Sequence, residues 1–91
     1  MNKEYTYPLD YEWSTEEILH VMSFYQAVEI GYEEGILAGK MQEAYDDFKK
    51  IVPSKSEEKQ LFKAFEKVSG KVPYNLIKQL KDSEPSKIIK A

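Results

Sequence analysis

The sequence predicts an all-α fold: a small antiparallel helical bundle of three main helices and a short fourth. Two serine capping boxes, Ser14–Glu17 and Ser54–Glu57, each open an apolar pattern of helical period. Pro53 separates two helical segments, because it lacks an amide hydrogen and restricts the residue before it. With 91 residues, 42% hydrophobic and 32% charged, the chain fits one domain. We expect that domain to cover residues 1–82 and a flexible tail to cover 83–91.

The N-terminal segment, residues 1–13, is predicted to be an extended aromatic arm that lies on the helical core. Apolar residues occupy every second position of this segment: Tyr5, Tyr7, Leu9, Tyr11 and Trp13. This period is typical of a strand, but Pro8 weakens a ladder and the chain has no second run of this kind to pair with it. An edge strand that pairs with its own copy in a dimer is the alternative.

The first helix is expected to begin after Ser14 and to end at Gly35, which can adopt the left-handed conformation of a helix stop. Its main apolar face has 3.6-residue spacing and comprises Ile18, Val21, Met22, Tyr25, Val28 and Tyr32. Leu19 and Ile30 lie on the opposite side. A helix that is apolar on two sides is either the central helix of the bundle, which we favour, or part of a subunit interface.

Three further helices are predicted, over residues 37–51, 55–69 and 73–81. The second helix has one narrow apolar stripe, and the third ends at Gly70, a residue suited to a left-handed cap. Pro73 suits the first turn of the short fourth helix.

Charge is unevenly distributed along the chain. Residues 1–47 carry eleven acidic residues and two lysines (−9), whereas residues 48–91 carry five acidic residues and eleven lysines (+6). We expect the two halves to attract one another within the fold, and an acidic partner for the basic half is the alternative. Cysteine is absent, and no apolar run approaches the length of about 20 residues that spans a bilayer. We therefore expect a cytoplasmic protein without a membrane segment.

Two residues of the first helix are candidates for a metal or small-molecule site. Glu29 falls within the apolar face, where an unpaired carboxylate would have a raised pKa. We expect that a tyrosine hydroxyl, a lysine or a backbone amide satisfies it, or that it lies at the rim of the face. His20 is the only histidine, and Glu17 stands three residues before it as in di-iron bundles. The second copy of that motif is missing, so we expect no metal and interpret His20 as a partly buried structural residue.

The third helix carries a ladder of lysines at every fourth position: Lys55, Lys59, Lys63 and Lys67. Two helices joined by a tight Val-Pro-Ser turn resemble a helix-turn-helix, and lysines can contact phosphates. However, the chain contains no arginine, and Glu58 and Glu66 interrupt the basic surface. A solvated face is the favoured interpretation, and a nucleic-acid-associated regulator is the alternative function.

The motifs that accompany common chemistries are missing: a phosphate-binding glycine loop, a Gly-x-Ser-x-Gly elbow and a His-Glu-x-x-His helix. We predict that the protein is not an enzyme and needs no cofactor. The leading hypothesis is a non-catalytic protein-interaction module, which binds an unidentified protein or its own copy as a homodimer. Leu19 and Ile30 are the candidate contact residues.

Two stretches resemble a small bacterial family, uncharacterised protein family 0223. One is Tyr-Pro-Leu-Asp-Tyr-x-Trp-Ser-Thr-Glu-Glu at residues 7–17, and the other is Phe-Lys-Lys-Ile-Val-Pro-Ser-Lys-Ser-Glu-Glu-Lys at residues 48–59. The resemblance covers roughly residues 5–82, and the Lys71-Val-Pro segment departs from the family pattern. It implies an all-α fold and a cytoplasmic bacterial protein, and it assigns no activity, ligand or catalytic residue.

Overall fold

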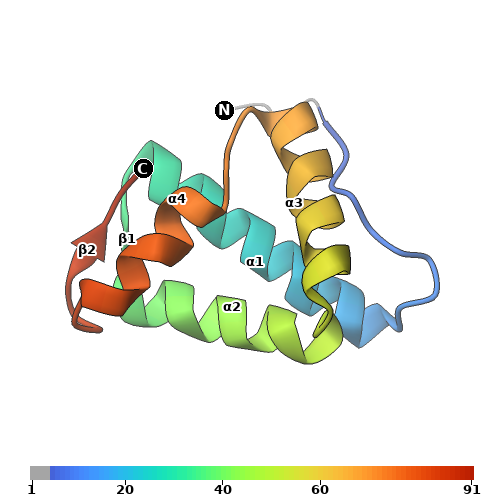
Figure 1. Cartoon of the computed structure of the whole chain (residues 1–91), viewed down its shortest axis with the longest axis horizontal. Helices are drawn as coiled ribbons and strands as arrows, with labels where there is room; N and C mark the ends of the chain where they lie inside the picture. Colours follow the sequence, from blue (N-terminus) through green and yellow to red (C-terminus); the bar gives the residue numbers. More distant parts are fainter. Residues whose placement is uncertain (1–4) are drawn as a thin grey trace.

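A computed structural model describes residues 5–91 of the chain (Figure 1). In chain order its elements are α1 (Thr15–Glu33), β1 (Ile36–Leu37), α2 (Ala38–Ile51), α3 (Lys55–Ser69), α4 (Tyr74–Ile77), a 3-10 helix η1 (Lys78–Asp82) and β2 (Ile88–Ile89). The predicted all-α fold with three main helices and a short fourth is confirmed. The helix bounds agree with the sequence patterns to within a few residues, and the fourth helix continues as a 3-10 turn.

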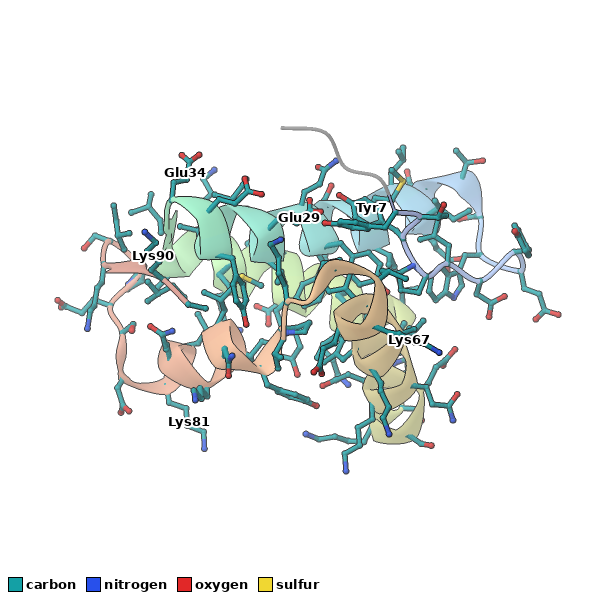
Figure 2. The ribbon with its side chains drawn as sticks, turned by 90° about the horizontal axis from the view of Figure 1, so that it is seen from above. Tyr7, Glu29, Glu34, Lys67, Lys81 and Lys90 are labelled. Carbon is teal, nitrogen blue, oxygen red and sulfur yellow. The ribbon has the colours of Figure 1, made fainter. Side chains whose placement is uncertain are left out.

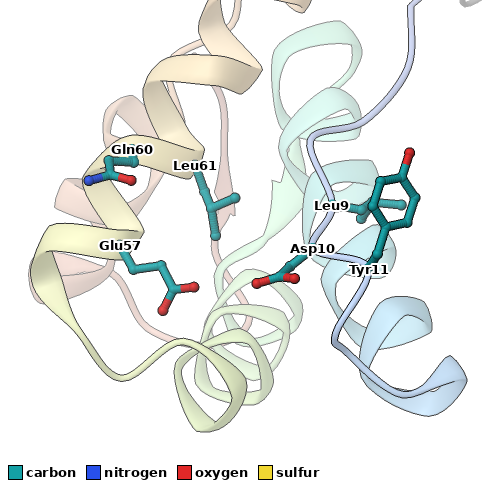
Figure 3. A pocket seen from close by; sticks show the side chains of 6 residues that line it. All are labelled: Leu9, Asp10, Tyr11, Glu57, Gln60 and Leu61. Atoms are coloured by element: carbon teal, nitrogen blue, oxygen red, sulfur yellow. The ribbon is translucent and has the colours of Figure 1, made fainter.

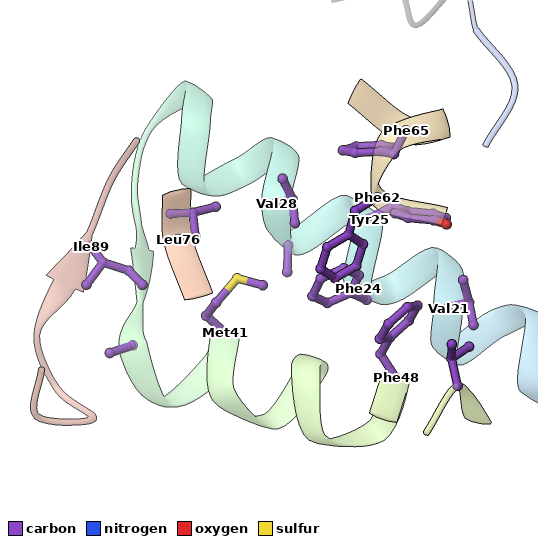
Figure 4. Packing of buried hydrophobic residues seen from close by; sticks show 13 residues of the cluster. Val21, Phe24, Tyr25, Val28, Met41, Phe48, Phe62, Phe65, Leu76 and Ile89 are labelled. Carbon is purple, nitrogen blue, oxygen red and sulfur yellow. The ribbon is translucent and has the colours of Figure 1, made fainter. Parts of the chain in front are cut away.

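The long helices α1 and α2 run antiparallel and side by side, and α3 rises across them at one end (Figure 1). The short α4 and η1 lie over the other end of the α1–α2 pair, against α2. The core between these elements is aromatic where α3 crosses (Figure 4). The ring of Phe24 stacks on that of Phe48 of α2, with the ring centroids 4.7 Å apart, and on that of Phe62 of α3, with the centroids 5.5 Å apart. Tyr25 of α1 stacks on Phe65 at 4.6 Å, so α1 is the central helix.

The helix ends follow the capping signals of the sequence. At α1 the box is complete: the Ser14 hydroxyl accepts from the Glu17 amide at 3.1 Å, and the Glu17 carboxylate accepts from the Ser14 amide at 2.8 Å. At α3 only the Ser54 hydroxyl contributes, accepting from the Glu57 amide at 3.3 Å. Gly35 and Gly70 have φ of 94° and 74°, a left-handed conformation that favours glycine after a helix.

The predicted flexible tail over residues 83–91 is wrong. Ile88 and Ile89 form β2, which pairs antiparallel with β1, so that Ile36 lies opposite Ile89. Ile89 is only 1% exposed, and the Gly39 amide donates to the Pro85 carbonyl at 2.9 Å. Ile89 therefore belongs to the core, whereas the neighbouring Ile88 is exposed. A two-residue strand with a distant partner leaves no local signal in the sequence.

The N-terminal arm is extended and lies on the helices, as predicted, although residues 1–4 lie outside the described residues. The Asp10 carbonyl accepts from the Trp13 amide at 3.1 Å, and this turn breaks the alternation of the arm. As a result Tyr5, Tyr7 and Trp13 pack against the core, whereas Tyr11 is 99% exposed. Across residues 5–91, no helix is long and apolar enough to cross a membrane.

Candidate functional site

Glu29 is buried under the N-terminal arm. The residue is 2% exposed, and its carboxylate accepts hydrogen bonds from the hydroxyls of Tyr5 and Tyr7, the latter at 2.7 Å. Figure 2 shows the side chains of Tyr7 and Glu29 close together beside α1. Of the alternatives that the sequence leaves open for this carboxylate, the structure shows tyrosine hydroxyls as partners. Glu29 therefore fastens the arm to α1, and the Tyr7 ring adds a contact with Tyr25 at 5.3 Å.

A second buried carboxylate, Glu58, joins three helices. It is fully buried in the first turns of α3 and lies 2.5 Å from the Lys49 ammonium of α2. The hydroxyl of Tyr74, from α4, donates to it at 2.5 Å, and that of Tyr45, from α2, donates at 3.2 Å. We call Glu58 and these three partners the Glu58 cluster. Every side chain of the cluster has an opposite charge or a hydrogen-bond partner within it.

The protonation of the Glu58 cluster follows from its contacts. Burial opposes ionisation of Glu58, but the hydrogen bonds from Lys49 and Tyr74 and the Lys49 charge hold its pKa below the usual value. Burial, followed by the Glu58 charge, raises the pKa of Tyr45 to about 12. Burial and the hydrogen bond to Glu58 raise the pKa of Tyr74 as well. At neutral pH the carboxylate is charged and both phenols are protonated, so no group of the cluster is poised to exchange a proton.

Sequence reasoning missed Glu58 as a buried group, because it was interpreted as an interruption of the lysine surface. The signal was present: Glu58 lies three, four and seven residues before Leu61, Phe62 and Phe65, the apolar face of α3. A glutamate on that face has to be buried with the face and therefore needs partners.

His20 does not meet Glu29. Their separation of nine positions corresponds to half a turn around α1 and about 13 Å along it. Half of the His20 side-chain surface is exposed, and its Nδ1 atom lies 3.8 Å from a carboxylate oxygen of Asp47 on α2. Glu17, which the Glu-x-x-His pattern of a di-iron bundle would use as a ligand, caps α1 as its capping box predicts. Within residues 5–91, no group of three potential metal ligands occurs.

The two candidate contact residues on α1 lie on one solvent-facing stripe. Leu19 is 58% and Ile30 42% exposed, and their separation of eleven positions is about three turns. Ser23 and Gln26 lie between them on the same side and are also exposed. We call these four residues the α1 outer stripe. It is uncharged, because the only Asp, Glu or Lys between residues 18 and 32 is the buried Glu29.

The lysine ladder lies on the solvent side of α3. Lys55, Lys59, Lys63 and Lys67 are all exposed, and among residues 5–91 none of them forms an ion pair. The ion pairs that do form do not join the acidic and basic halves across the fold: Lys50–Asp47 is local within α2, and Lys49–Glu58 lies within the basic half.

The fold and its buried carboxylates can be set beside known proteins. A model of a family described as "Uncharacterised protein family (UPF0223)" matches residues 4–89 of the chain. The chain belongs to UPF0223. A UPF0223 protein of Bacillus pumilus is 51% identical over 87 residues, covering 96% of this chain and 98% of the relative.

Other UPF0223 proteins match over a similar length. One from Bacillus cytotoxicus is 49% identical over 96% of this chain and 98% of its own length. One from Streptococcus pneumoniae is 49% identical over 97% of this chain and 96% of its own length. The relatives are bacterial proteins, and the UPF0223 description assigns no activity, ligand or partner.

Proposed function

We propose that this protein is a non-catalytic interaction module that forms a homodimer through the α1 outer stripe. The supporting observation is the pair of exposed apolar side chains, Leu19 and Ile30, on an uncharged helix face. Charged residues make up 32% of the chain, so a three-turn helix face without an exposed carboxylate or lysine is unusual in it. Charge-depleted faces with apolar residues are typical of interface centres.

The spacing of the α1 outer stripe suits pairing with itself. A two-fold axis midway between Leu19 and Ile30, crossing α1 between Phe24 and Tyr25, places Leu19 opposite Ile30 of a second copy. The same axis places the small Ser23 opposite Gln26, which allows the two helices to approach closely. Each apolar residue thus meets an apolar residue.

At each end of the paired helices, two glutamates of different copies approach one another and repel. Glu16 and Glu34 share one flank of α1, at opposite ends of the outer stripe, so each approaches the other in an antiparallel pair. We therefore expect a weak dimer that tightens at higher salt, because salt screens this repulsion. Figure 2 shows Glu34 extending from the C-terminal end of α1.

Two observations support the absence of catalysis. Tyrosine hydroxyls donate to both buried carboxylates, and Lys49 neutralises Glu58. Buried polar side-chain atoms within residues 5–91 all have hydrogen-bond partners. We include a cytoplasmic location in the proposal, because a chain without cysteine suits a reducing compartment.

Sedimentation velocity across a concentration series, at low and high salt, tests the homodimer. We expect a reversible dimer that Ile30→Glu abolishes and Glu34→Lys strengthens. Val68→Glu is the matched control, because Val68 on α3 is 43% exposed and Ile30 is 42% exposed. A monomer at every concentration and salt level would overturn the proposal, as would an equal loss of dimer in the Val68 variant.

The four exposed lysines of α3, which form no ion pair within residues 5–91, favour nucleic-acid binding as a second candidate function. Fluorescence anisotropy with duplex DNA tests it: binding should weaken steeply with salt and vanish in the Lys59→Glu/Lys63→Glu variant. The absence of binding at low salt excludes this function.

A further inference from the structure

A hollow of about 420 Å³ lies between the N-terminal arm and the first turns of α3 (Figure 3). Leu9, Asp10 and Tyr11 line it from the arm, and Glu57, Gln60 and Leu61 line it from α3. It is distinct from the α1 outer stripe and from both buried carboxylates. The two leucines are half-buried, so part of the lining is apolar.

Two carboxylates face one another across this hollow. Figure 3 shows the side chains of Asp10 and Glu57 extending toward each other from opposite walls, with Leu61 between them. The Oδ1 atom of Asp10 accepts from the Glu12 amide at 2.9 Å, and this turn orients the carboxylate and leaves Oδ2 available. Both carboxylates therefore line the same hollow, where a cation can approach them together.

The Glu57 carboxylate does not form the capping hydrogen bond that the sequence predicts for it. The Ser54–Glu57 capping box predicts that this carboxylate accepts from the Ser54 amide, as Glu17 does at Ser14. At α3 only the Ser54 hydroxyl bond forms, and the Glu57 carboxylate has no hydrogen-bond or ion-pair partner in residues 5–91. It points into the hollow instead (Figure 3).

The described part of the chain does not neutralise this hollow. Among residues 5–91 no lysine lines it, and the ion pairs involve Asp47 and Glu58 but neither Asp10 nor Glu57. All thirteen basic residues are lysine, so a guanidinium group can come only from another molecule.

We propose that this hollow binds a basic side chain of a partner polypeptide, and arginine in preference to lysine. A planar guanidinium can donate to both carboxylates at once, whereas an ammonium is a compact point charge. The methylene stem of the arginine would lie on Leu9 and Leu61, as long basic side chains do on apolar surface. The ligand is thus a peptide segment with an arginine next to apolar residues.

This site does not depend on the proposed homodimer. The α1 outer stripe and the hollow share no residue, so peptide binding can be measured on the monomeric Ile30→Glu variant. A failure of the dimer would leave the hollow testable, and a failure of peptide binding would leave the dimer untouched.

Nuclear magnetic resonance titration with a blocked Leu-Arg-Leu tripeptide tests the site. Saturable shifts should be confined to the amides of residues 9–11 and 57–61. The matched peptide carries citrulline, which keeps the shape of arginine and removes its charge, and it should bind at least about tenfold more weakly. A lysine peptide should bind with intermediate affinity.

Substitutions in and beside the hollow test whether the peptide binds there. Asp10→Asn/Glu57→Gln should weaken arginine binding about tenfold or more, while both substitutions retain the backbone turns. Glu12→Gln removes one charge from the same arm outside the lining and should leave binding unchanged. Equal binding of the citrulline peptide, shifts spread over the acidic surface, or an equal loss in the Glu12 variant would each overturn the proposal.

Discussion

The Nζ atom of Lys49 lies 2.5 Å from Oε1 of Glu58, and this pair joins the C-terminal half of α2 to the first turns of α3. The carboxylate is fully buried, whereas 27% of the lysine side chain remains exposed. The pair is therefore asymmetric: Lys49 can be hydrated if it loses its partner, but Glu58 cannot. The free energy of unfolding should respond more strongly to the loss of the lysine charge than to any surface ion pair of the molecule.

Replacing Lys49 with methionine should lower the free energy of unfolding by about 3 kcal/mol, because it leaves a buried carboxylate without its counter-charge. Urea denaturation measures this loss. Lys50→Met is the matched control: the Lys50 side chain is 79% exposed and pairs with Asp47 on the surface, so it should change stability by less than about 0.5 kcal/mol. Equal effects of the two substitutions would show that Glu58 does not need Lys49.

The free energy of unfolding should fall at acidic pH, and Glu58→Gln should remove the part of this fall that comes from protonation of Glu58. The pKa of Glu58 is lowered in the folded state relative to the unfolded value of about 4.3, so near and below that value the unfolded chain binds more protons. The stabilising effect of ionised Glu58 is present above this value and is lost as pH falls through the folded pKa. The difference in unfolding free energy between wild type and variant should shrink below about pH 5. A constant difference across that range would contradict the lowered pKa.

Tyr7→Phe should destabilise the protein by about 2 kcal/mol, because it deletes a hydroxyl that donates to the buried Glu29 carboxylate at 2.7 Å. The change keeps the ring and its contact with Tyr25. Tyr11→Phe, in the same arm but at a fully exposed position, should be neutral. Thermal unfolding of both variants, with limited proteolysis of the arm, checks the prediction. Unchanged stability and protease resistance in the Tyr7 variant would count against it.

Ile89→Ala should cost about 3 kcal/mol, the loss typical of a buried isoleucine. The neighbouring Ile88→Ala should cost less than about 0.5 kcal/mol, because Ile88 is 62% exposed. Chemical denaturation of this adjacent pair distinguishes a docked strand from a flexible tail. If both substitutions are neutral, β2 is not part of the core.

The helices were predictable because each signal lies within a few residues of the place where it acts. Ser14, Pro53 and Gly70 set helix ends through local hydrogen bonds or backbone conformation. Ile89 was missed because its partner, Ile36, lies far along the chain and no short-range pattern connects them. Tyr11 follows the alternation of the arm in sequence but escapes burial, because the turn at Asp10 redirects the chain.

The candidate sites were also predictable only where the signal is local in the sequence. Helical spacing placed Glu29 within the apolar face of α1, but it did not identify Tyr5 and Tyr7 of the arm as its partners. Glu58 occupies an equivalent position on α3 but was grouped with the lysines that follow it in sequence. The hollow between the arm and α3 could not be predicted, because Asp10 and Glu57 meet only when the arm is laid against the third helix.

The β1–β2 pairing also has a consequence for the order of folding. Ile89 lies 53 positions beyond its partner Ile36 (89 − 36), so this contact carries a loop-closure cost that the α1–α2 hairpin avoids. We expect the ribbon to form after the transition state, with a φ-value near zero at Ile89. In stopped-flow measurements Ile89→Ala should then accelerate unfolding and leave the refolding rate almost unchanged. The C-terminal strand would then pair last during folding, and its contacts would set the unfolding rate and thus the lifetime of the folded state.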